Sequence, residues 1–276
     1  MTDRKSTSFL QAEGLAPLPT LLSGPKCTKR FKSLCFELIC TTTYYYKPSR
    51  GGTKLPSTAA RRVWTEYFGR FYDEIPTHDF QYRPYIKSYI SDDARLFDIA
   101  QWMARQKLLS SEAVQEIDKL AREELIGYRI IGEYEAGETT FVPISDEAEG
   151  EANQRDFAEL SSNSGAQQHF VQAVEEIKNG HFRGSVAESI SGVESVLKVV
   201  SGDKSAPFGK ALNIVSKDAA LHPALKKALE GLYGWSNSPN GMRHALSDEA
   251  VPVDEPEARF MLSACLAFAA WIKRSV

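Results

Sequence analysis

The sequence predicts a mainly α-helical protein that contains one small β-hairpin. Over most of the chain after residue 30, apolar residues recur at spacings of three and four, as they do on one face of an α-helix. The period shortens only over 128–144, where two β-rich runs flank the turn Glu135-Ala-Gly-Glu138. With 276 residues, 42% hydrophobic and 25% charged, the chain is long and apolar enough for two globular domains.

The N-terminal domain is expected to span residues 1–150 and to hold four helical segments before the hairpin. Residues 1–25 lack periodicity and are expected to form an irregular arm. A β-favouring run over 41–46 follows the first helix, and the Gly- and Pro-containing stretch 47–53 breaks it. Pro76 stops the second helix, whose aromatic stripe from Val63 to Phe71 is expected to lie in the core. The four helical segments are predicted near 31–40, 57–75, 82–107 and 110–126, the last capped by Ser110 or Ser111.

The C-terminal domain is expected to span residues 165–276 and to form an up-and-down helical bundle. Residues 145–165 are first acidic and then rich in Ser and Asn, so they are interpreted as a boundary region between the two domains, with the boundary at 150–165. The bundle helices are predicted at 167–179, 184–201, 207–217, 223–234 and 255–273.

Several classes of function are disfavoured by the residues that the chain contains. No apolar run approaches the length of a membrane helix and no secretory signal precedes the first helix, so a cytoplasmic protein without membrane association is expected. The four cysteines form no CxxC pair and the five histidines lie singly, which disfavours a metal site. The phosphate-binding pattern GxxxxGK[ST] and the patterns GxSxG and GxGxxG are absent, so no cofactor is expected.

Charge is segregated along the chain although the net charge is only −3. Between residues 26 and 62 nine basic residues face one acid, Glu37, and between 133 and 159 nine acids face one base, Arg155. A basic stretch interleaved with the aromatic rings of Phe31, Phe36 and Tyr44 is compatible with contact to a nucleic-acid backbone and its bases. The alternative is amphipathic packing with a solvated basic face that the acidic segment neutralises within the molecule.

The candidate catalytic residues are the adjacent Arg243 and His244, which end a loop rich in Gly, Asn, Pro and Ser between the last two helices. An arginine can stabilise the charge that develops on a phosphorane, and a histidine can move a proton near neutral pH. RNA supplies its own nucleophile, the 2′-hydroxyl, so this chemistry requires no metal. In the alternative interpretation, Arg243 pairs with a helix carboxylate and His244 closes a turn.

Five polar residues are candidates for supporting this site. Glu188 lies three residues from both Ser185 and Ser191, and a glutamate on that side of the helix could hold Arg243. The alternatives are that Glu188 is solvated and that Glu194 pairs with Lys198. Asn237 and Asn240 serve either turn geometry or substrate contact, and Asp248 is a candidate general base.

Several ordered motifs resemble a known protein class. The C-terminal stretch with Ser185-Val-Ala-Glu-Ser-Ile-Ser, Leu221-His-Pro-Ala-Leu-Lys-Lys-Ala, Asn240-Gly-Met-Arg-His-Ala and Ala258-Arg-Phe-Met-Leu resembles the abortive-infection C-terminal domain of the HEPN-like class. Upstream, Val63-Trp-Thr-Glu-Tyr-Phe, Gly127-Tyr-Arg-Ile-Ile and Val142-Pro-Ile-Ser-Asp-Glu resemble the N-terminal domain of AbiJ-type phage-defence proteins.

The resemblance implies a HEPN-like helical bundle in a homodimeric antiviral-defence protein that responds to a phage-derived trigger. Many relatives are metal-independent endoribonucleases, so RNA is the implied substrate or ligand. The usual HEPN motif is an Arg, a polar residue and a His, with four to six residues between the Arg and the His. Here Arg243 and His244 match the first two places, but Asp248, Glu249 and Ala250 occupy the third. The alternative function is therefore a non-catalytic sensing or regulatory dimerisation module with a degenerate site.

Overall fold

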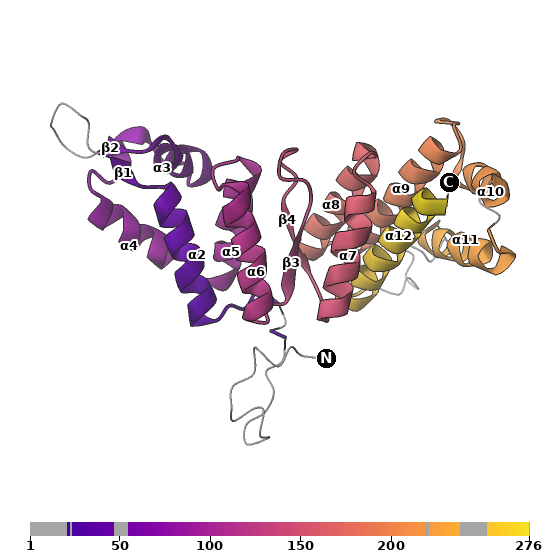
Figure 1. Cartoon of the computed structure of the whole chain (residues 1–276), viewed down its shortest axis with the longest axis horizontal. Coiled ribbons are helices and arrows are strands. Elements are labelled where there is room, and N and C mark those ends of the chain that lie inside the picture. The colour runs from indigo at the N-terminus through magenta and orange to yellow at the C-terminus, as the bar shows by residue number, and fades with distance from the viewer. Residues whose placement is uncertain (1–20, 23, 47–54, 219–220, 238–252, 276) are drawn as a thin grey trace, which may run out of the picture. The chain divides into compact units, whose positions relative to one another are not determined.

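The computed structural model describes residues 21–22, 24–46, 55–218, 221–237 and 253–275. They belong to two compact units, which we describe separately. Unit 1 comprises Met1–Ile130 and Tyr134–Glu147, and unit 2 comprises Ile131–Glu133 and Ala148–Val276. The chain is mainly α-helical with two small two-stranded sheets, which confirms the predicted fold class (Figure 1).

Unit 1 contains helices, two short hairpins and two irregular helical turns. β1 pairs antiparallel with β2, and β3 pairs with β4 at the site of the predicted hairpin. The elements are α2 (Lys29–Thr42), β1 (Tyr45–Tyr46), β2 (Leu55–Pro56), α3 (Thr58–Arg62), the π-helix η1 (Val63–Tyr67), the 3-10 helix η2 (Tyr72–Glu74), α4 (Asp79–Tyr89), α5 (Asp93–Arg105), α6 (Ser111–Glu123), β3 (Tyr128–Ile131) and β4 (Thr140–Pro143).

The helix predicted over 82–107 is two helices, so that part of the sequence prediction is wrong. The Oγ of Ser91 donates to the carbonyl of Ser88 at 2.6 Å, next to the end of α4. The carboxylate of Asp92 then accepts from the amide of Ala94 at 3.0 Å and caps α5. Ser110, one of the two residues predicted to cap the next helix, caps α6 through the amide of Ala113.

The aromatic stripe predicted to lie in the core is buried only in part. Val63 and Trp64 are buried, but 77% of Phe71 is exposed to solvent. Gly69 adopts a positive φ of 62°, a conformation that favours glycine, and the helical path ends before Phe71. Phe71 therefore belongs to the surface of unit 1.

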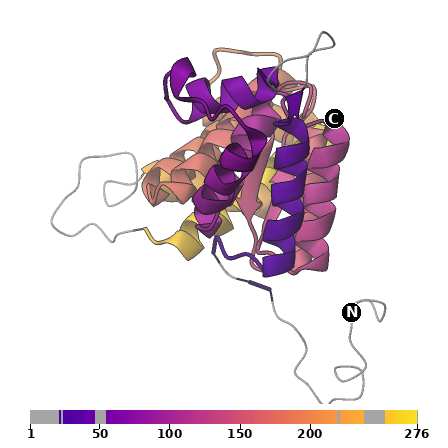
Figure 2. The same cartoon turned by 90° about the vertical axis from the view of Figure 1, so that its left-hand side faces the viewer.

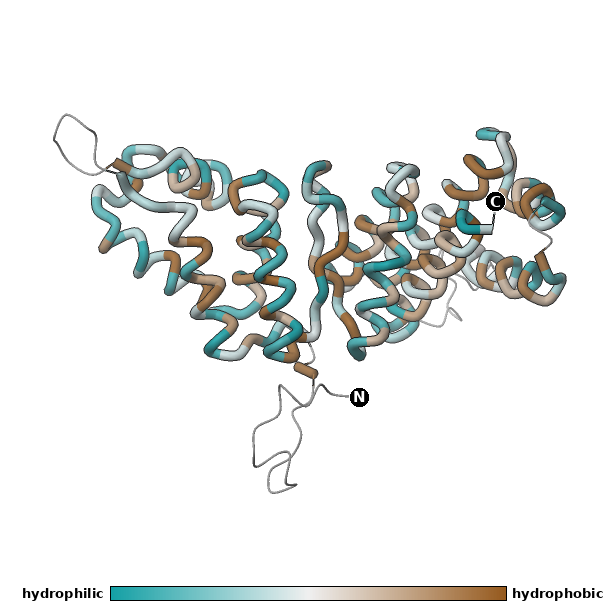
Figure 3. Tube along the Cα trace, viewed as in Figure 1, coloured by the Kyte–Doolittle hydropathy of each residue, from teal (hydrophilic) through white to brown (hydrophobic). Residues whose placement is uncertain are grey.

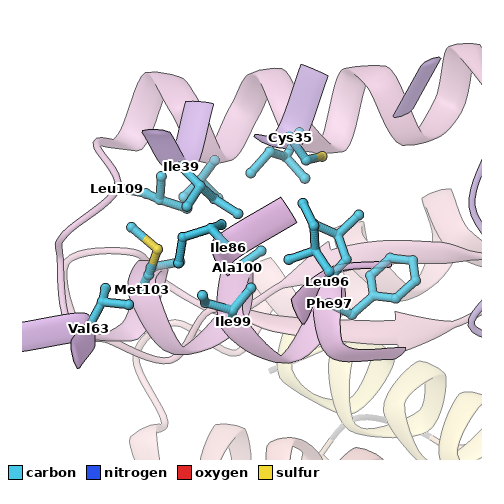
Figure 4. Packing of buried hydrophobic residues seen from close by; sticks show 14 of the residues in the cluster. Cys35, Ile39, Val63, Ile86, Leu96, Phe97, Ile99, Ala100, Met103 and Leu109 are labelled. Atoms are coloured by element: carbon cyan, nitrogen blue, oxygen red, sulfur yellow. The ribbon is translucent and has the colours of Figure 1, made fainter. Parts of the chain in front are cut away.

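The core of unit 1 lies where α2 packs against α4, α5 and α6 (Figures 1 and 2). Cys35 and Ile39 project from α2 towards Ile86 of α4 and towards Leu96 and other apolar residues of α5 (Figure 4). The buried residues of α2 recur at spacings of four and one, as the sequence period predicts.

A buried arginine connects the β3–β4 hairpin to the end of unit 1. The side chain of Arg129 is 0% exposed; its Nε donates to Glu147 at 3.1 Å, and its Nη2 also pairs with that carboxylate. Its Nη1 donates to the backbone carbonyls of Ile126 and Tyr128 at 2.8 and 2.6 Å. Arg122 Nη1 also binds Glu147, at 2.5 Å. Glu147 is therefore a shared counter-ion of two guanidinium groups, and Arg122 also pairs with Asp118.

Glu147→Gln is expected to lower the free energy of unfolding by about 3 kcal/mol, because it leaves the buried Arg129 without a counter-charge. The free energy is measured by urea titration. Glu135→Gln is the matched control, since Glu135 is 78% exposed in its pair with Lys107, and a change within about 0.5 kcal/mol is expected there. Equal effects of the two substitutions would contradict a special role for Glu147.

Unit 2 is a bundle of helices. The predicted segments appear in order, although one further helix precedes them. The helices are α7 (Glu147–Glu159), α8 (Ser164–Lys178), α9 (Phe182–Val200), α10 (Phe208–Asp218), α11 (Pro223–Asn237) and α12 (Glu255–Ser275). The hydropathy colouring shows apolar and polar residues along each of them (Figure 3).

Helix α7 occupies most of the stretch that was interpreted as a boundary region, so the segment is structured. Two of its acids make contacts with α12: Glu149 Oε1 accepts from Ser263 Oγ at 3.1 Å, and Asp156 pairs with Arg274 at 3.3 Å. Phe157 is buried. Tertiary contacts of acidic and polar side chains therefore stabilise α7, whose apolar residues form only a weak stripe.

Helix α9 is the central helix of unit 2, because α8, α10, α11 and α12 all contact it. α8 and α9 run antiparallel: Asn163 approaches Ser195, and His169 approaches Glu188. They approach closely where Gly192 faces the ring of Phe170. A Cβ atom at residue 192 would lie 2.7 Å from two carbons of that ring. The close contact of α8 and α9 thus requires glycine at this position.

Gly192→Ala is expected to destabilise the protein by about 1–3 kcal/mol, because the added methyl group overlaps a buried ring. Gly231→Ala in α11 is the matched control. Nothing lies within 4 Å of the added atom there, so helix propensity should stabilise that variant by about 0.5–1 kcal/mol. Thermal melts of both variants test this, and shifts of the same sign would contradict the packing argument.

Candidate functional site

Glu188 on α9 forms a hydrogen bond with the imidazole of His169 on α8. The distance between His169 Nδ1 and Glu188 Oε2 is 2.7 Å, and both side chains are partly exposed, at 42% and 32%. A carboxylate that binds one ring nitrogen fixes the orientation of the imidazole and leaves its other nitrogen for proton transfer. This pair is therefore a candidate acid–base group at the surface of unit 2.

A second imidazole–carboxylate pair lies further along the same two helices. His181 Nδ1 lies 3.2 Å from Glu176 Oε2, and Gln172 donates to the other oxygen of Glu176 at 2.8 Å. His181 immediately precedes α9. The polar edge between α8 and α9 thus carries two histidines, each beside a glutamate.

The sequence alone did not indicate these pairs. Glu188 was a predicted site residue, but its partner was expected to be Arg243. The short connection between α8 and α9 does predict antiparallel neighbours. The register that brings His169 opposite Glu188, however, depends on the Gly192–Phe170 contact, which the sequence does not show.

The structure places only some of the predicted site residues. Glu194 lies half-buried on α9, and no described residue pairs with it, so the predicted i,i+4 pair with Lys198 does not form. Asn237 is the last residue of α11. The remaining predicted residues lie outside the described part of the chain: Arg243, His244, Asn240 and Asp248.

Arg259 is a further polar residue of interest, which sequence reasoning did not single out as a site residue. It lies in the first turns of α12, the helix that follows the Arg243–His244 segment. Its Nε and Nη2 are buried and have no hydrogen-bond partner among the described residues. Its one ion pair there is a distant one, with 3.6 Å between Nη1 and Glu255 Oε1.

The hydroxyl of Ser185 on α9 is also buried without a partner in the described part of the chain. Buried donors without partners are rare in native proteins, because each lost hydrogen bond costs about 1–3 kcal/mol. Arg259 and Ser185 are therefore candidate binding groups for a ligand with acceptor oxygens. No sequence pattern indicates that a buried polar group lacks a hydrogen-bond partner, so these two residues could be found only from the structure.

The thiols are poor candidates for nucleophiles. Burial raises the pKa of Cys265 on α12 and of Cys40 on α2 to about 12, and it raises that of Cys35 further. The pKa of Cys27 is also raised to about 12, by burial and by the charge of Asp93. No group of three His, Cys, Asp or Glu side chains that could hold a metal ion occurs among the described residues.

Three cations of the basic segment 26–62 pair with acids of unit 1. Those acids lie outside residues 133–159, so the predicted neutralisation by that segment is wrong for these cations. The pairs are Arg30 with Glu123 and Glu124, Lys32 with Asp93, and Arg62 with Glu66.

No protein-family model matches the chain, and no curated protein or solved structure is significantly similar to it. The resemblance to the HEPN-like class therefore rests on the sequence motifs alone. In the described residues, no helix is both long and apolar enough to cross a membrane.

Native protein is expected to resist alkylation by iodoacetamide at pH 8, because the thiolate is the reactive form and all four thiols have raised pKa values. Unfolding in urea should expose them to rapid labelling, which mass spectrometry detects. The pKa of a buried thiol such as Cys265 is about 12 in the folded protein and 9.0 in the unfolded chain, so the protonated thiol stabilises the fold fully below pH 9. This stabilisation is lost as the pH rises from about 9 towards 12. Rapid labelling of the native protein would contradict the assignment.

Proposed function

We propose that the protein is a metal-independent endoribonuclease of the HEPN-like class that acts in abortive infection against phage. The observation that carries the proposal is Arg259 at the start of α12, two of whose guanidinium nitrogens are buried and have no hydrogen-bond partner among the described residues. Arg243 and His244 lie in the segment that joins α11 to this helix. Guanidinium nitrogens that are buried without a hydrogen-bond acceptor are costly, and a phosphate group would supply acceptor oxygens and negative charge.

The His169–Glu188 pair gives independent support. An imidazole held by a carboxylate is suited to proton transfer, and RNA cleavage requires two such transfers. The two residues lie on α8 and α9, and α9 also contacts α11 and α12. The proposal nevertheless assigns the chemical step to His244, which follows Arg243 as the second residue of the HEPN motif.

The proposed reaction is an internal transesterification of RNA. A base removes the proton of a 2′-hydroxyl, the 2′-oxygen attacks the neighbouring phosphorus, and the bond from phosphorus to the 5′-oxygen breaks. The leaving 5′-oxygen takes up a proton. His244 serves as one of the two proton-transfer groups and Asp248 as the candidate for the other, while Arg243 and Arg259 stabilise the charge on the phosphorane.

The double variant Arg243→Ala, His244→Ala is expected to lose cleavage of single-stranded RNA in EDTA by about 100-fold or more. The control double variant His181→Ala, Lys198→Ala removes one imidazole and one cation elsewhere in unit 2 and should retain activity. Gel analysis of end-labelled RNA measures both. Equal cleavage by the wild type and the first double variant would contradict the catalytic assignment.

Arg259→Met separates a binding role from a structural one within the same experiment. If Arg259 binds phosphate, removing its buried charge should lower RNA cleavage while the melting temperature stays constant or rises. A melting temperature that falls together with activity would show that Arg259 serves the fold. Lys227→Met is the control for the substitution itself, since Lys227 is an exposed cation of α11.

The second candidate function is a non-catalytic regulatory dimer, for which the exposed ring of Phe260 on α12 is the favouring observation. The ring of Phe260 is 63% exposed, and an exposed apolar side chain of this size can mark a contact with another protein chain. Phage challenge of cells that carry the Arg243, His244 double variant discriminates the two functions. Retained protection favours the regulatory dimer, whereas lost protection by a folded variant favours the nuclease.

A further inference from the structure

Unit 1 exposes a group of aromatic rings around the β1–β2 hairpin. Exposure alternates over Tyr44, which directly precedes β1, and the two residues of β1: Tyr44 and Tyr46 are exposed and Tyr45 between them is buried. The amide of Ser57 donates to the carbonyl of Tyr44 at 2.9 Å, so the pairing of the hairpin extends to Tyr44. Alternate residues of a strand point to the same side, so the two exposed tyrosines share one face of the hairpin. We define the aromatic surface as the exposed rings of Tyr44, Tyr46, Phe71, Tyr72 and Phe80.

Hydrogen bonds and a cation–ring contact bring the parts of this surface together. The hydroxyl of Tyr45 donates to the carbonyl of Pro76 at 2.6 Å, which joins β1 to the segment that leads into α4 and Phe80. Arg61 of α3 donates to the carbonyl of Pro56 in β2 at 3.1 Å, and its guanidinium lies 5.9 Å from the centre of the Tyr72 ring. The hairpin thus adjoins both the η2 turn and the start of α4.

Beneath the surface, buried rings give it a rigid support. Tyr82 of α4 packs against Tyr45 and Trp64 with centroid distances of 5.6 and 6.2 Å. Trp64 Nε1 donates to the carbonyl of Phe71 at 3.2 Å, which holds the backbone that carries the exposed ring. His78 stacks on Phe80 at 5.2 Å with an interplanar angle of 12°. Exposed rings on a fixed base lose little conformational freedom when a ligand stacks on them.

The charge near this surface favours an anionic partner. Arg61 has no acidic partner among the described residues, whereas Arg30, Lys32 and Arg62 of the same basic segment are each paired with a carboxylate. The sequence that joins β1 to β2 contains Lys47, Arg50 and Lys54 and no acid. Arg61 therefore offers the exposed rings a neighbouring positive charge that no described carboxylate takes up.

We propose that the aromatic surface of unit 1 binds single-stranded nucleic acid, with bases stacked on its rings and phosphates near Arg61. Every base presents a flat face to an aromatic ring, so this mode of binding tolerates any sequence. Unit 1 then retains the strand by contacts that differ from those of unit 2. The proposal does not depend on cleavage and stands if the protein is not a nuclease.

Fluorescence anisotropy of full-length protein with a labelled single-stranded DNA of about 20 nucleotides tests the proposal. DNA lacks the 2′-hydroxyl and is not a substrate for the proposed cleavage, so binding is measured apart from activity. Phe71→Ala, Phe80→Ala should weaken binding about tenfold or more, with an unchanged melting temperature because both rings are exposed. The double variant Phe71→Trp, Phe80→Trp should restore it.

The control double variant Val199→Ala, Leu225→Ala removes two exposed apolar side chains of unit 2 and should bind within about twofold of the wild type. Absence of binding by the wild type, or equal weakening by the two alanine variants, overturns the proposal. The proposal is also overturned if the wild type self-associates and the variant Phe71→Ala, Phe80→Ala does not, because the rings would then contact a second protein chain.

Discussion

The packing of α9 against its neighbours is the constraint on which unit 2 depends. α8, α10, α11 and α12 all contact this one helix, and Gly192 lets the ring of Phe170 approach its backbone. Apolar contacts therefore take up most of its circumference, and polar side chains are confined to narrow edges. Glu188 lies on such an edge, where the antiparallel register of α8 brings His169 within 2.7 Å. The same packing positions α11 and α12, the helices that the Arg243–His244 segment joins.

Unit 1 follows a different principle, because buried and paired charges hold it together beside an apolar core. Glu147 is the shared counter-ion of the fully buried Arg129 and of Arg122, and acids on α5 and α6 pair with cations near the start of α2. Internal pairing explains why a strongly basic segment does not by itself indicate a nucleic-acid site. What distinguishes the hairpin end is the combination of exposed rings with Arg61, a cation that lacks a paired carboxylate among the described residues.

The sequence predicted those parts of the fold that depend on local periodicity. α2, α6, α9 and α12 follow from their apolar spacing, and the hairpin of β3 and β4 from the change of period. The break at Asp92 was missed because one capping side chain interrupts an otherwise continuous pattern. Helix α7 was missed because tertiary contacts such as that between Asp156 and Arg274 hold it.

The candidate site was less predictable than the fold. Adjacent Arg243 and His244 are visible in the sequence because both residue types have characteristic chemistry and lie in an unusual loop. The His169–Glu188 pair depends on helix register, and the unpaired nitrogens of Arg259 depend on which groups surround them. Neither property is local, so neither can be inferred from residue spacing.

The chemistry of the cleaved ends tests the central claim most directly. Single-stranded RNA and DNA of the same sequence should be incubated with the protein in EDTA, and the products should be analysed by mass spectrometry. The proposed transesterification predicts fragments of the RNA that end in a 2′,3′-cyclic phosphate, and intact DNA. Intact RNA, or cleavage of both strands alike, would contradict it.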